Sequence, residues 1–392
     1  KNLTVHAMKL FFIALKLNFE SGGGSAWELD AKIRSLIKQG HSAIVITLFS
    51  GQNRLQSGLP YKVVEEQIAS LSLWNIQHGV LRMLKKYQAE ADLFQVEGQF
   101  AYGSGLYRLL GGRKPVIVHF NRELSSFPES TRKNSNKFGS LKKLFRFWLE
   151  RSVGFPLINR NDLLTFTSPI LLDLYASFGV NKIKSSVIPD FFDSNEFRNP
   201  ARLSESTAGK NGGDEFSVFC TGRMVWEKGF DVLLKAVDIL VKRGERYRLL
   251  LSGDGPEKQA LQNLSAQLGI SEHVAFLGWL EKPALIKEMA KADVIVIQRW
   301  RPEVTSMIAL EALALGVPAI VPVNSALSWQ MQNSALTFED ENFHELADQI
   351  KKMRDNPALQ TDLKVAGQIR LGELDLPVSL SKLMTAIAQV TK

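Results

Sequence analysis

Short apolar runs alternate with longer amphipathic runs along most of the chain. Residues 9–15 (KLFFIAL), 43–49 (AIVITLF) and 115–120 (PVIVHF) have the length and composition of buried strands, and residues 25–39 show helical spacing. Strands that alternate with helices are typical of parallel sheets covered by helices on both faces. The first half of the chain is therefore predicted to form such a sheet.

The alternation stops at residues 199–214, which are polar, rich in Gly and Ser and without periodicity. We predict a linker there. The pattern then restarts, with strands expected at 216–220, 247–252, 273–277, 293–298 and 318–323 and helices at 229–243, 256–268, 282–291 and 304–315. The prediction is an α/β protein with two doubly wound domains, at residues 1–198 and 214–370.

Length and composition agree with two globular domains. The chain has 392 residues, which is more than one compact core usually holds, and 45% of them are hydrophobic. The single cysteine, Cys220, fits a reducing compartment and falls in a predicted buried strand, so we expect an inert thiol. No apolar run is long enough to span a bilayer. The apolar run from Met8 is interpreted as the first strand, and Met8 as the functional start.

The net charge of +8 is unevenly distributed. Residues 101–160 hold twelve basic and three acidic residues, so the net charge of this segment exceeds that of the whole chain. This concentration of positive charge indicates a local anionic partner. Within them, residues 137–151 (KFGSLKKLFRFWLER) place aromatic and aliphatic residues at helical spacing. This pattern fits either a helix on an anionic membrane surface or a core-facing helix with a solvated back. The membrane-facing candidates are Lys142, Lys143, Arg146 and Trp148. No motif supports nucleic-acid binding.

Several strand-to-helix turns combine glycine with charge. In a doubly wound sheet such turns lie at the carboxyl edge, where helix N-termini favour phosphate. Residues 20–27 (ESGGGSAW) let backbone approach a ligand, although a flexible loop would look the same. Arg223 and Lys228 follow a strand and precede a helix, and together they could hold a diphosphate or be solvated charges. Residues 253–256 (GDGP) form a similar turn.

Two carboxylates and one histidine complete the candidate chemistry. Glu303 and Glu311 are eight residues apart at the start of a predicted helix, so they point roughly the same way. Carboxylates accept hydrogen bonds from sugar hydroxyls, and Glu311 lies within an apolar stretch where it needs a partner. His119 ends a predicted strand; structural histidines are commoner than catalytic ones, but this position favours a functional role.

The ordered set of motifs resembles family 4 of the retaining glycosyltransferases. The set is G-R-x4-K-G at residues 222–229, G-D-G-P at 253–256, and E-x7-E at 303–311 followed by A-L-G-V-P at 314–318. In the first half, GGGSAWELDAKIRSLIKQGH and FTSPILLDLY with SVIPDFFD are similar to the family's Gly-Gly loop and its later Ser-helix and Ile-Pro elements. The resemblance covers nearly the whole chain.

The resemblance implies a GT-B fold, with two Rossmann-like domains facing a central cleft. Residues 1–198 would bind the acceptor, 214–370 the nucleotide-sugar donor, and a C-terminal helix within 371–392 would pack back on the first domain. The implied reaction moves a hexose from a UDP- or GDP-linked sugar to a glycan or lipid-linked acceptor with retention, and it uses no metal and no cofactor. The implied location is cytoplasmic, peripheral on the inner face of the membrane.

The resemblance also assigns residue roles. The catalytic candidates are His119, Arg223, Lys228 and Glu303, where His119 lies beside the sugar and the two cations neutralise the diphosphate. The donor-binding candidates are Gly23, Gly24, Gly253, Gly278, Trp279, Thr305, Ser306, Met307 and Glu311. The chain departs from the family at Thr305-Ser306 (usually Phe-Gly), Arg299-Trp300 (Pro-Ser), Asp190 (Asn) and Phe120 (Asp), which bears on donor identity. A sugar-nucleotide epimerase and a non-catalytic relative are the alternatives.

Overall fold

The computed structural model describes residues 6–20, 24–124, 148–197, 215–298 and 304–391. The chain divides into two compact units. The first is Lys1–Phe191 together with Leu376–Lys392, and the second is Phe192–Asp375. The linker predicted at 199–214 and the candidate residues Gly23, Lys142, Lys143, Arg146 and Glu303 lie outside the described residues.

The first unit is built on a seven-stranded parallel sheet in the order β3-β2-β1-β4-β5-β6-β7. The strands are β1 (Lys9–Ala14), β2 (Ser42–Thr47), β3 (Lys62–Glu65), β4 (Leu93–Glu97), β5 (Val116–Phe120), β6 (Leu163–Phe166) and β7 (Ser185–Val187). The helices are α1 (Gly24–Lys38), α2 (Leu73–Tyr87), α3 (Ala101–Leu109), α5 (Phe155–Ile158), α6 (Pro169–Ser177) and α15 (Leu376–Val390).

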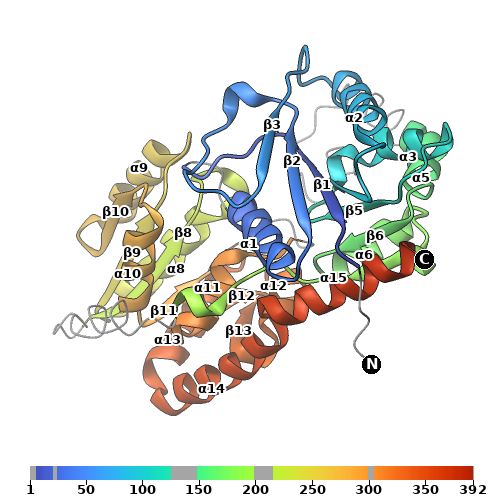
Figure 1. Ribbon diagram of the computed structural model, residues 1–392. Coiled ribbons are helices and arrows are strands. Elements are labelled where there is room, and N and C mark those ends of the chain that lie inside the picture. Colours follow the sequence, from blue (N-terminus) through green and yellow to red (C-terminus); the bar gives the residue numbers. More distant parts are fainter. Residues whose placement is uncertain (1–5, 21–23, 125–147, 198–214, 299–303, 392) are drawn as a thin grey trace. The chain divides into compact units, whose positions relative to one another are not determined.

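Helices cover both faces of this sheet (Figure 1). Alternating side chains on its strands therefore pack into two separate cores, one on each face. In β1, Phe11 faces the core formed with α2, α3, α5 and α6, whereas Phe12 faces the core formed with α1 and α15. Leu383 and Ile387 of α15 belong to the second core and are 2% exposed. Burial on both faces explains why these strands are continuously apolar in the sequence.

The second unit holds a six-stranded parallel sheet in the order β10-β9-β8-β11-β12-β13. Its strands are β8 (Phe216–Thr221), β9 (Tyr247–Ser252), β10 (Val274–Gly278), β11 (Val294–Val296), β12 (Ala319–Pro322) and β13 (Ala335–Phe338). Its helices are α8 (Phe230–Lys242), α9 (Lys258–Leu268), α10 (Lys282–Lys291), α11 (Met307–Leu315), α12 (Ala326–Met331), α13 (Phe343–Asp355) and α14 (Pro357–Leu374).

The unit boundary differs from the one expected from the pattern. Phe192 and Phe197, which fall before the predicted linker, stack on each other with ring centroids 5.1 Å apart and pack in the core of the second unit. Leu371 and Leu374 of α14 lie in the same core, so the second unit continues to Asp375. Apolar contacts, and not the polar linker, therefore set the boundary.

Both sheets reverse their strand order at one point, between β1 and β4 in the first unit and between β8 and β11 in the second. Loops that leave adjacent strands in opposite directions open a crevice at such a point, which is where doubly wound sheets bind ligands. The predicted α/β class with two doubly wound sheets is confirmed. Among the described helices, none is both long and apolar enough to cross a membrane.

Candidate functional site

The turn after β8 carries the two candidate cations of the second unit. The chain leaves β8 at Thr221, forms a short 3₁₀ turn at Trp226–Lys228, and enters α8 through Gly229, which adopts a left-handed conformation (φ 60°, ψ 28°). Glycine adopts this conformation without steric cost. Gly229 therefore ends the 3₁₀ turn at Lys228, so the lysine lies directly before the helix N-terminus.

A second glycine turn, after β9, locks onto the first. Gly253 has φ 121°, and a β-carbon on it would lie 1.9 Å from the carbonyl oxygen of Gly222. The backbone N–H of Met224 donates to Asp254 O at 2.8 Å, and that of Gly253 donates to Gly278 O at 2.7 Å. A β-carbon at position 253 would clash with this backbone, so the glycine there is a structural requirement.

Arg223 and Lys228 have different environments. The Arg223 side chain is exposed, whereas Lys228 is partly buried. The Lys228 stem lies over Gly222, whose β-carbon would be 3.5 Å from Cε. Burial lowers the pKa of Lys228, and Cys220 and Glu227 oppose the shift. Burial also raises the pKa of the Cys220 thiol to about 12, which agrees with the inert thiol expected.

A buried glutamine supports the same turn from the neighbouring strand. Gln298, which is 3% exposed, follows β11. With its amide oriented to satisfy both groups, Nε2 donates to the carbonyl of Gly229 and Oε1 accepts from the N–H of Leu233 at 3.3 Å. Sequence reasoning missed Gln298, because a polar residue that ends a strand gives no sign of its partner.

Glu311 occupies the buried face of α11. It is 6% exposed, and its Oε2 has no hydrogen-bond partner among the described residues. Burial raises the pKa of Glu311 to about 7, Lys282 lowers it, and Glu196 raises it. A buried carboxyl oxygen without a partner can accept a hydrogen bond from a ligand hydroxyl.

The remaining donor-binding candidates lie on neighbouring loops of the same sheet. Thr305, Ser306 and Met307 lead into α11, which begins at Met307 and not at residue 304, and the N–H of Ser306 donates to Gln330 Oε1 at 2.9 Å. Gly278 (φ 69°) ends β10, and the following Trp279 is 53% exposed. The second unit thus brings all described donor-binding candidates except Gly24 to the carboxyl edge of one sheet.

In the first unit, His119 lies near the end of β5 and is 6% exposed. Its Nδ1 lies 3.0 Å from Thr165 Oγ1, and its Nε2 lies 3.5 Å from Oε1 of Glu28. Burial lowers the pKa of His119. Gly24 is the first residue of α1, the helix that carries Glu28.

Sequence reasoning missed the charged groups around His119. These groups are Glu28 and Lys32 on α1 and Glu97 at the end of β4. A signal was present, because Leu36, which is fully buried, follows Glu28 and Lys32 at four-residue spacing and therefore shares their face.

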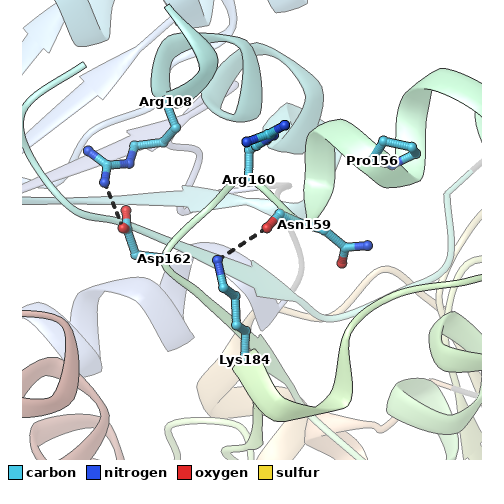
Figure 2. Close-up of a pocket in the computed structure, with 6 residues that line it drawn as sticks. All are labelled: Arg108, Pro156, Asn159, Arg160, Asp162 and Lys184. Atoms are coloured by element: carbon cyan, nitrogen blue, oxygen red, sulfur yellow. Dashed lines mark hydrogen bonds and ion pairs between the residues drawn. The ribbon is translucent and has the colours of Figure 1, made fainter. Parts of the chain in front are cut away.

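The structure also has a basic pocket away from these loops (Figure 2). It is lined by Arg108, Pro156, Asn159, Arg160, Asp162 and Lys184. Asp162 precedes β6 and accepts from the N–H of Val116 at the start of β5, at 2.8 Å, so the pocket lies at the amino edge of the sheet. Asp162 also pairs with Arg108 at 2.9 Å. The pocket is therefore not part of the candidate site.

Of the membrane-facing candidates, the structure describes Trp148, which is 60% exposed. Leu149 and Val153, which are 45% and 49% exposed, follow it.

Within the described residues, no three His, Cys, Asp or Glu side chains are grouped so that they could hold a metal ion.

Comparisons with known proteins agree with this geometry. The chain is 33% identical over 156 residues to the lipopolysaccharide core biosynthesis glycosyltransferase LpsD of Rhizobium meliloti. The aligned residues make up 39% of this chain and 43% of that protein. Over 212 residues it is 27% identical to a GDP-mannose-dependent phosphatidylinositol monomannoside mannosyltransferase of Mycobacterium tuberculosis (52% and 55%). The matches thus span about half the length of these curated relatives.

The fold matches solved structures over nearly the whole chain. The crystal structure of Anabaena HepE in complex with UDP and glucose has a TM-score of 0.76 at 18% identity, and the match covers 97% of this chain and 99% of that one. The family described as glycosyl transferases group 1 matches residues 204–370, and the one described as glycosyltransferase family 4 matches residues 22–196. Together these two matches cover most of the sequence, and the chain belongs to the group 1 glycosyltransferases with the GT-B fold.

Proposed function

We propose that this protein transfers a hexose from a nucleotide diphosphate sugar to a glycan or lipid-linked acceptor, with retention at the anomeric carbon. The observation that carries the proposal is the interlocked pair of glycine turns in the second unit. They place Lys228 and Arg223 at the carboxyl end of β8, beside the point where the strand order reverses. Cations at a helix N-terminus in this position suit a diphosphate.

The residues divide the work by chemistry. When the bond between the anomeric carbon and the diphosphate oxygen breaks, negative charge grows on the leaving diphosphate, and Arg223 and Lys228 stabilise it without a metal. The acceptor oxygen forms the new bond at that carbon and its proton passes to the departing diphosphate. Glu311 accepts hydrogen bonds from the ribose, Glu303 contacts the donor sugar, and Trp279 with Gly278 meets the base.

The choice of substrates is supported by the relatives. HepE was solved with UDP and glucose, and the mycobacterial relative is named as GDP-mannose-dependent. LpsD and the mycobacterial enzyme are named for lipopolysaccharide and phosphatidylinositol substrates. For this chain we propose a UDP- or GDP-linked hexose, a cell-envelope acceptor, and peripheral contact with the cytoplasmic face of the membrane through residues 137–151, which include Trp148.

The test is a thermal-shift screen of the protein against UDP-, GDP- and ADP-sugars, followed by turnover with glycan and lipid-linked acceptors. The expected result is stabilisation by one nucleotide class and an α-linked product from an α-linked donor. Addition of a chelator leaves the rate unchanged. An inverted product, or a free epimerised nucleotide sugar without an acceptor product, would contradict the proposal.

Membrane contact is tested separately, by co-sedimentation with vesicles that contain anionic or only zwitterionic phospholipids. Wild-type protein is expected to sediment with the anionic vesicles, and Trp148→Ser to do so less, because an aromatic side chain inserted at the interface is lost. Trp279→Ser, which alters an exposed Trp of the second unit, is the control. Equal sedimentation of both variants would contradict membrane contact at Trp148.

A further inference from the structure

The first helix of the first unit carries two charged side chains on its buried face. Glu28 and Lys32 are one turn apart on α1, they are 6% and 2% exposed, and Lys32 Nζ lies 3.7 Å from Glu28 Oε1. A pair at this spacing normally lies in water and contributes little to stability. A buried pair requires compensating neighbours, so its neighbours indicate its role.

Beneath the pair lies a polar row across three strands. Glu97, His119 and Thr165 are register partners on β4, β5 and β6, at the carboxyl ends of these strands. His119 shares a sheet face with Ile117, two residues earlier, which packs in the core formed with α1 and α15. Register partners point to the same face, so all three side chains of the row point toward α1.

The His119 ring is held between this row and α1. Nδ1 contacts Thr165 Oγ1 at 3.0 Å, and Nε2 faces Glu28 Oε1 at 3.5 Å. Neither Nε2 nor Oε1 has a hydrogen-bond partner among the described residues, and both atoms are shielded from solvent. A hydrogen bond between these two atoms, which a shift of a few tenths of an ångström forms, satisfies both of them.

The number of protons available decides which nitrogen carries one. Thr165 Oγ1 lies 3.3 Å from Val118 O and 3.0 Å from Nδ1 of His119. The hydroxyl has a single proton, so it can donate to only one of these two acceptors. If Thr165 donated to Val118, a neutral ring would carry its proton on Nδ1, and the bare Nε2 would face the Glu28 carboxylate. Two acceptors would then repel each other. If Thr165 donates to Nδ1, the Nε2–H points at Glu28, which is attractive.

Burial and the neighbouring Lys32 ammonium favour the neutral form of the ring. Burial lowers the pKa of His119, Lys32 lowers it further, and Glu28 opposes both. Burial also lowers the pKa of Lys32, but Glu28, Glu97 and Asp190 favour its ammonium form. Burial is the largest of these effects, so the pKa of Lys32 is lowered overall although the three carboxylates oppose the shift. The ammonium form is the one that pairs with Glu28 Oε1 at 3.7 Å. The ammonium also lies 4.5 Å from the centroid of the Phe191 ring, a favourable cation–π contact.

The acidic partners follow from the same cluster. Burial would raise the pKa of Glu28, but Lys32 and the His119 ring outweigh it and hold the pKa at about 2. Burial raises the pKa of Glu97, which Arg122 opposes. Glu28 is therefore ionised, and its Oε1 is the carboxylate oxygen that faces Nε2 of the ring.

We propose that Glu28 and Lys32 are positioning residues for His119. Glu28 accepts the Nε2 proton and thereby fixes the tautomer and the orientation of the ring, and Lys32 balances that carboxylate so that the ring does not take a second proton. Both ring nitrogens are then used within the protein. His119 therefore transfers no proton in the reaction. The inference rests on the proposed function only in placing a sugar beside His119.

The test is nuclear magnetic resonance of the full chain labelled with ¹⁵N-histidine, with the His119 signals assigned from the spectrum of His119→Gln. The wild-type ring is expected to be the neutral Nε2–H tautomer at pH 6.5 and above, because its pKa lies below the ordinary value of 6.5. Lys32→Met leaves the Glu28 carboxylate uncompensated beside the ring, so the proton affinity of His119 should increase at least about tenfold. Arg34→Met is the matched control, because Arg34 forms an i,i+4 pair with Asp30 on the same helix. It should leave the His119 titration unchanged.

A double variant keeps the test decisive if Lys32→Met does not fold. Glu28→Leu/Lys32→Met replaces the pair by apolar groups, which buried pairs usually tolerate, and the His119 ring should then populate both tautomers. An unchanged titration in Lys32→Met, or a single Nε2–H tautomer in the double variant, overturns the proposal.

Kinetics separate this inference from the proposed function. In Lys32→Met, kcat should fall as the pH decreases through the new pKa of His119, while KM for the donor stays constant. The wild type should show no such fall. If kcat of Lys32→Met does not change as the pH passes through the raised pKa of His119, the proposal that turnover requires a neutral ring is overturned. If the spectra are as expected but the wild type transfers no sugar from any donor, only the proposed function fails.

Discussion

The carbonyl oxygen of Gly222 occupies the space that a β-carbon on Gly253 would need. The distance would be 1.9 Å, and Gly253 has a φ of 121°, which other residues rarely adopt. The turn that carries Arg223 and Lys228 is thus held by direct backbone contact with the next βα turn. This contact places the two cations at the carboxyl edge of the sheet, and it leads to the first prediction.

Gly253→Ala should destabilise the second unit by about 2–5 kcal/mol, since it combines backbone strain with a clash against main-chain atoms that cannot move aside. Urea unfolding followed by circular dichroism measures the change. Gly372→Ala is the control, because Gly372 lies in α14 with nothing within 4 Å of an added β-carbon. It should be neutral or stabilise by up to about 1 kcal/mol. Equal stability of the two variants would show that the turns are not locked as described.

Lys228→Ala should fold and keep its melting temperature within a few degrees, yet lose on the order of a hundredfold or more in turnover, because a preorganised cation acts mainly on the transition state. The matched control is Lys242→Ala at the far end of α8, whose side chain is 67% exposed. It should keep full activity and change stability by about 0.5 kcal/mol or less. Near-wild-type turnover of Lys228→Ala with any accepted donor would refute the diphosphate role.

Arg223→Lys should also lower turnover, although the charge is kept, since an ammonium cannot replace the two parallel hydrogen bonds of a guanidinium. Arg223 is exposed, so the melting temperature of the variant should not change. Steady-state kinetics with the preferred donor measure the loss. A lysine variant as active as the wild type would mean that Arg223 supplies only positive charge.

Glu311→Gln should remove a pH dependence of stability. The folded-state pKa of about 7 lies above the ordinary value of 4.5, so the folded state holds the proton more tightly than the unfolded state. Stability from this group is fully present below pH 4.5 and is lost as the pH rises from 4.5 to about 7. As the pH rises across this interval, the free energy of unfolding of the variant should increase relative to that of the wild type by on the order of 3 kcal/mol. Urea unfolding of both proteins at several pH values measures it, and a constant difference would contradict the buried carboxyl.

Gln298→Leu should weaken the support of the Lys228 turn. The change removes the two side-chain hydrogen bonds of Gln298, while the Gly229 carbonyl still accepts from the N–H groups of Val232 at 3.0 Å and Leu233 at 3.4 Å, so the cost should be about 0.5–1.5 kcal/mol. Because Gly229 follows Lys228 directly, kcat should fall as well. Gln330→Leu is the informative comparison, since it removes a bond to Ser306 on another loop. A loss of stability with unchanged kcat for Gln298→Leu would mean that the turn keeps its position without the glutamine.

The candidate site was predictable to the extent that it depends on backbone geometry. Glycine followed by charge between a strand and a helix has few structural solutions, so the turns at Gly222 and Gly253 could be placed from the sequence alone. The spacing of Glu311 within an apolar helix likewise indicated burial. The mode of interlocking could not be foreseen, because it depends on which strands are neighbours in the sheet.

The His119 surroundings show the opposite case. In the sequence, Glu28 and Lys32 have the i,i+4 spacing of an ordinary surface pair, and nothing marks Thr165 as a neighbour of either residue. Nothing local connects them, since they are up to 137 residues apart in the chain. Only the sheet register and the packing of α1 bring them into contact.

The sequence by itself therefore determined the elements, their class and the turns rich in glycine, because these follow from local periodicity and backbone sterics. The tertiary structure decided which charges are buried and where the units divide. Phe192 and Phe197 belong to the second unit because their rings pack in its core, and Glu28 and Lys32 are buried because α1 covers the polar ends of β4, β5 and β6. Burial is a property of the assembled sheet and helices. It decides whether a charged side chain is a solvated surface group or part of a buried cluster, which the local sequence does not determine.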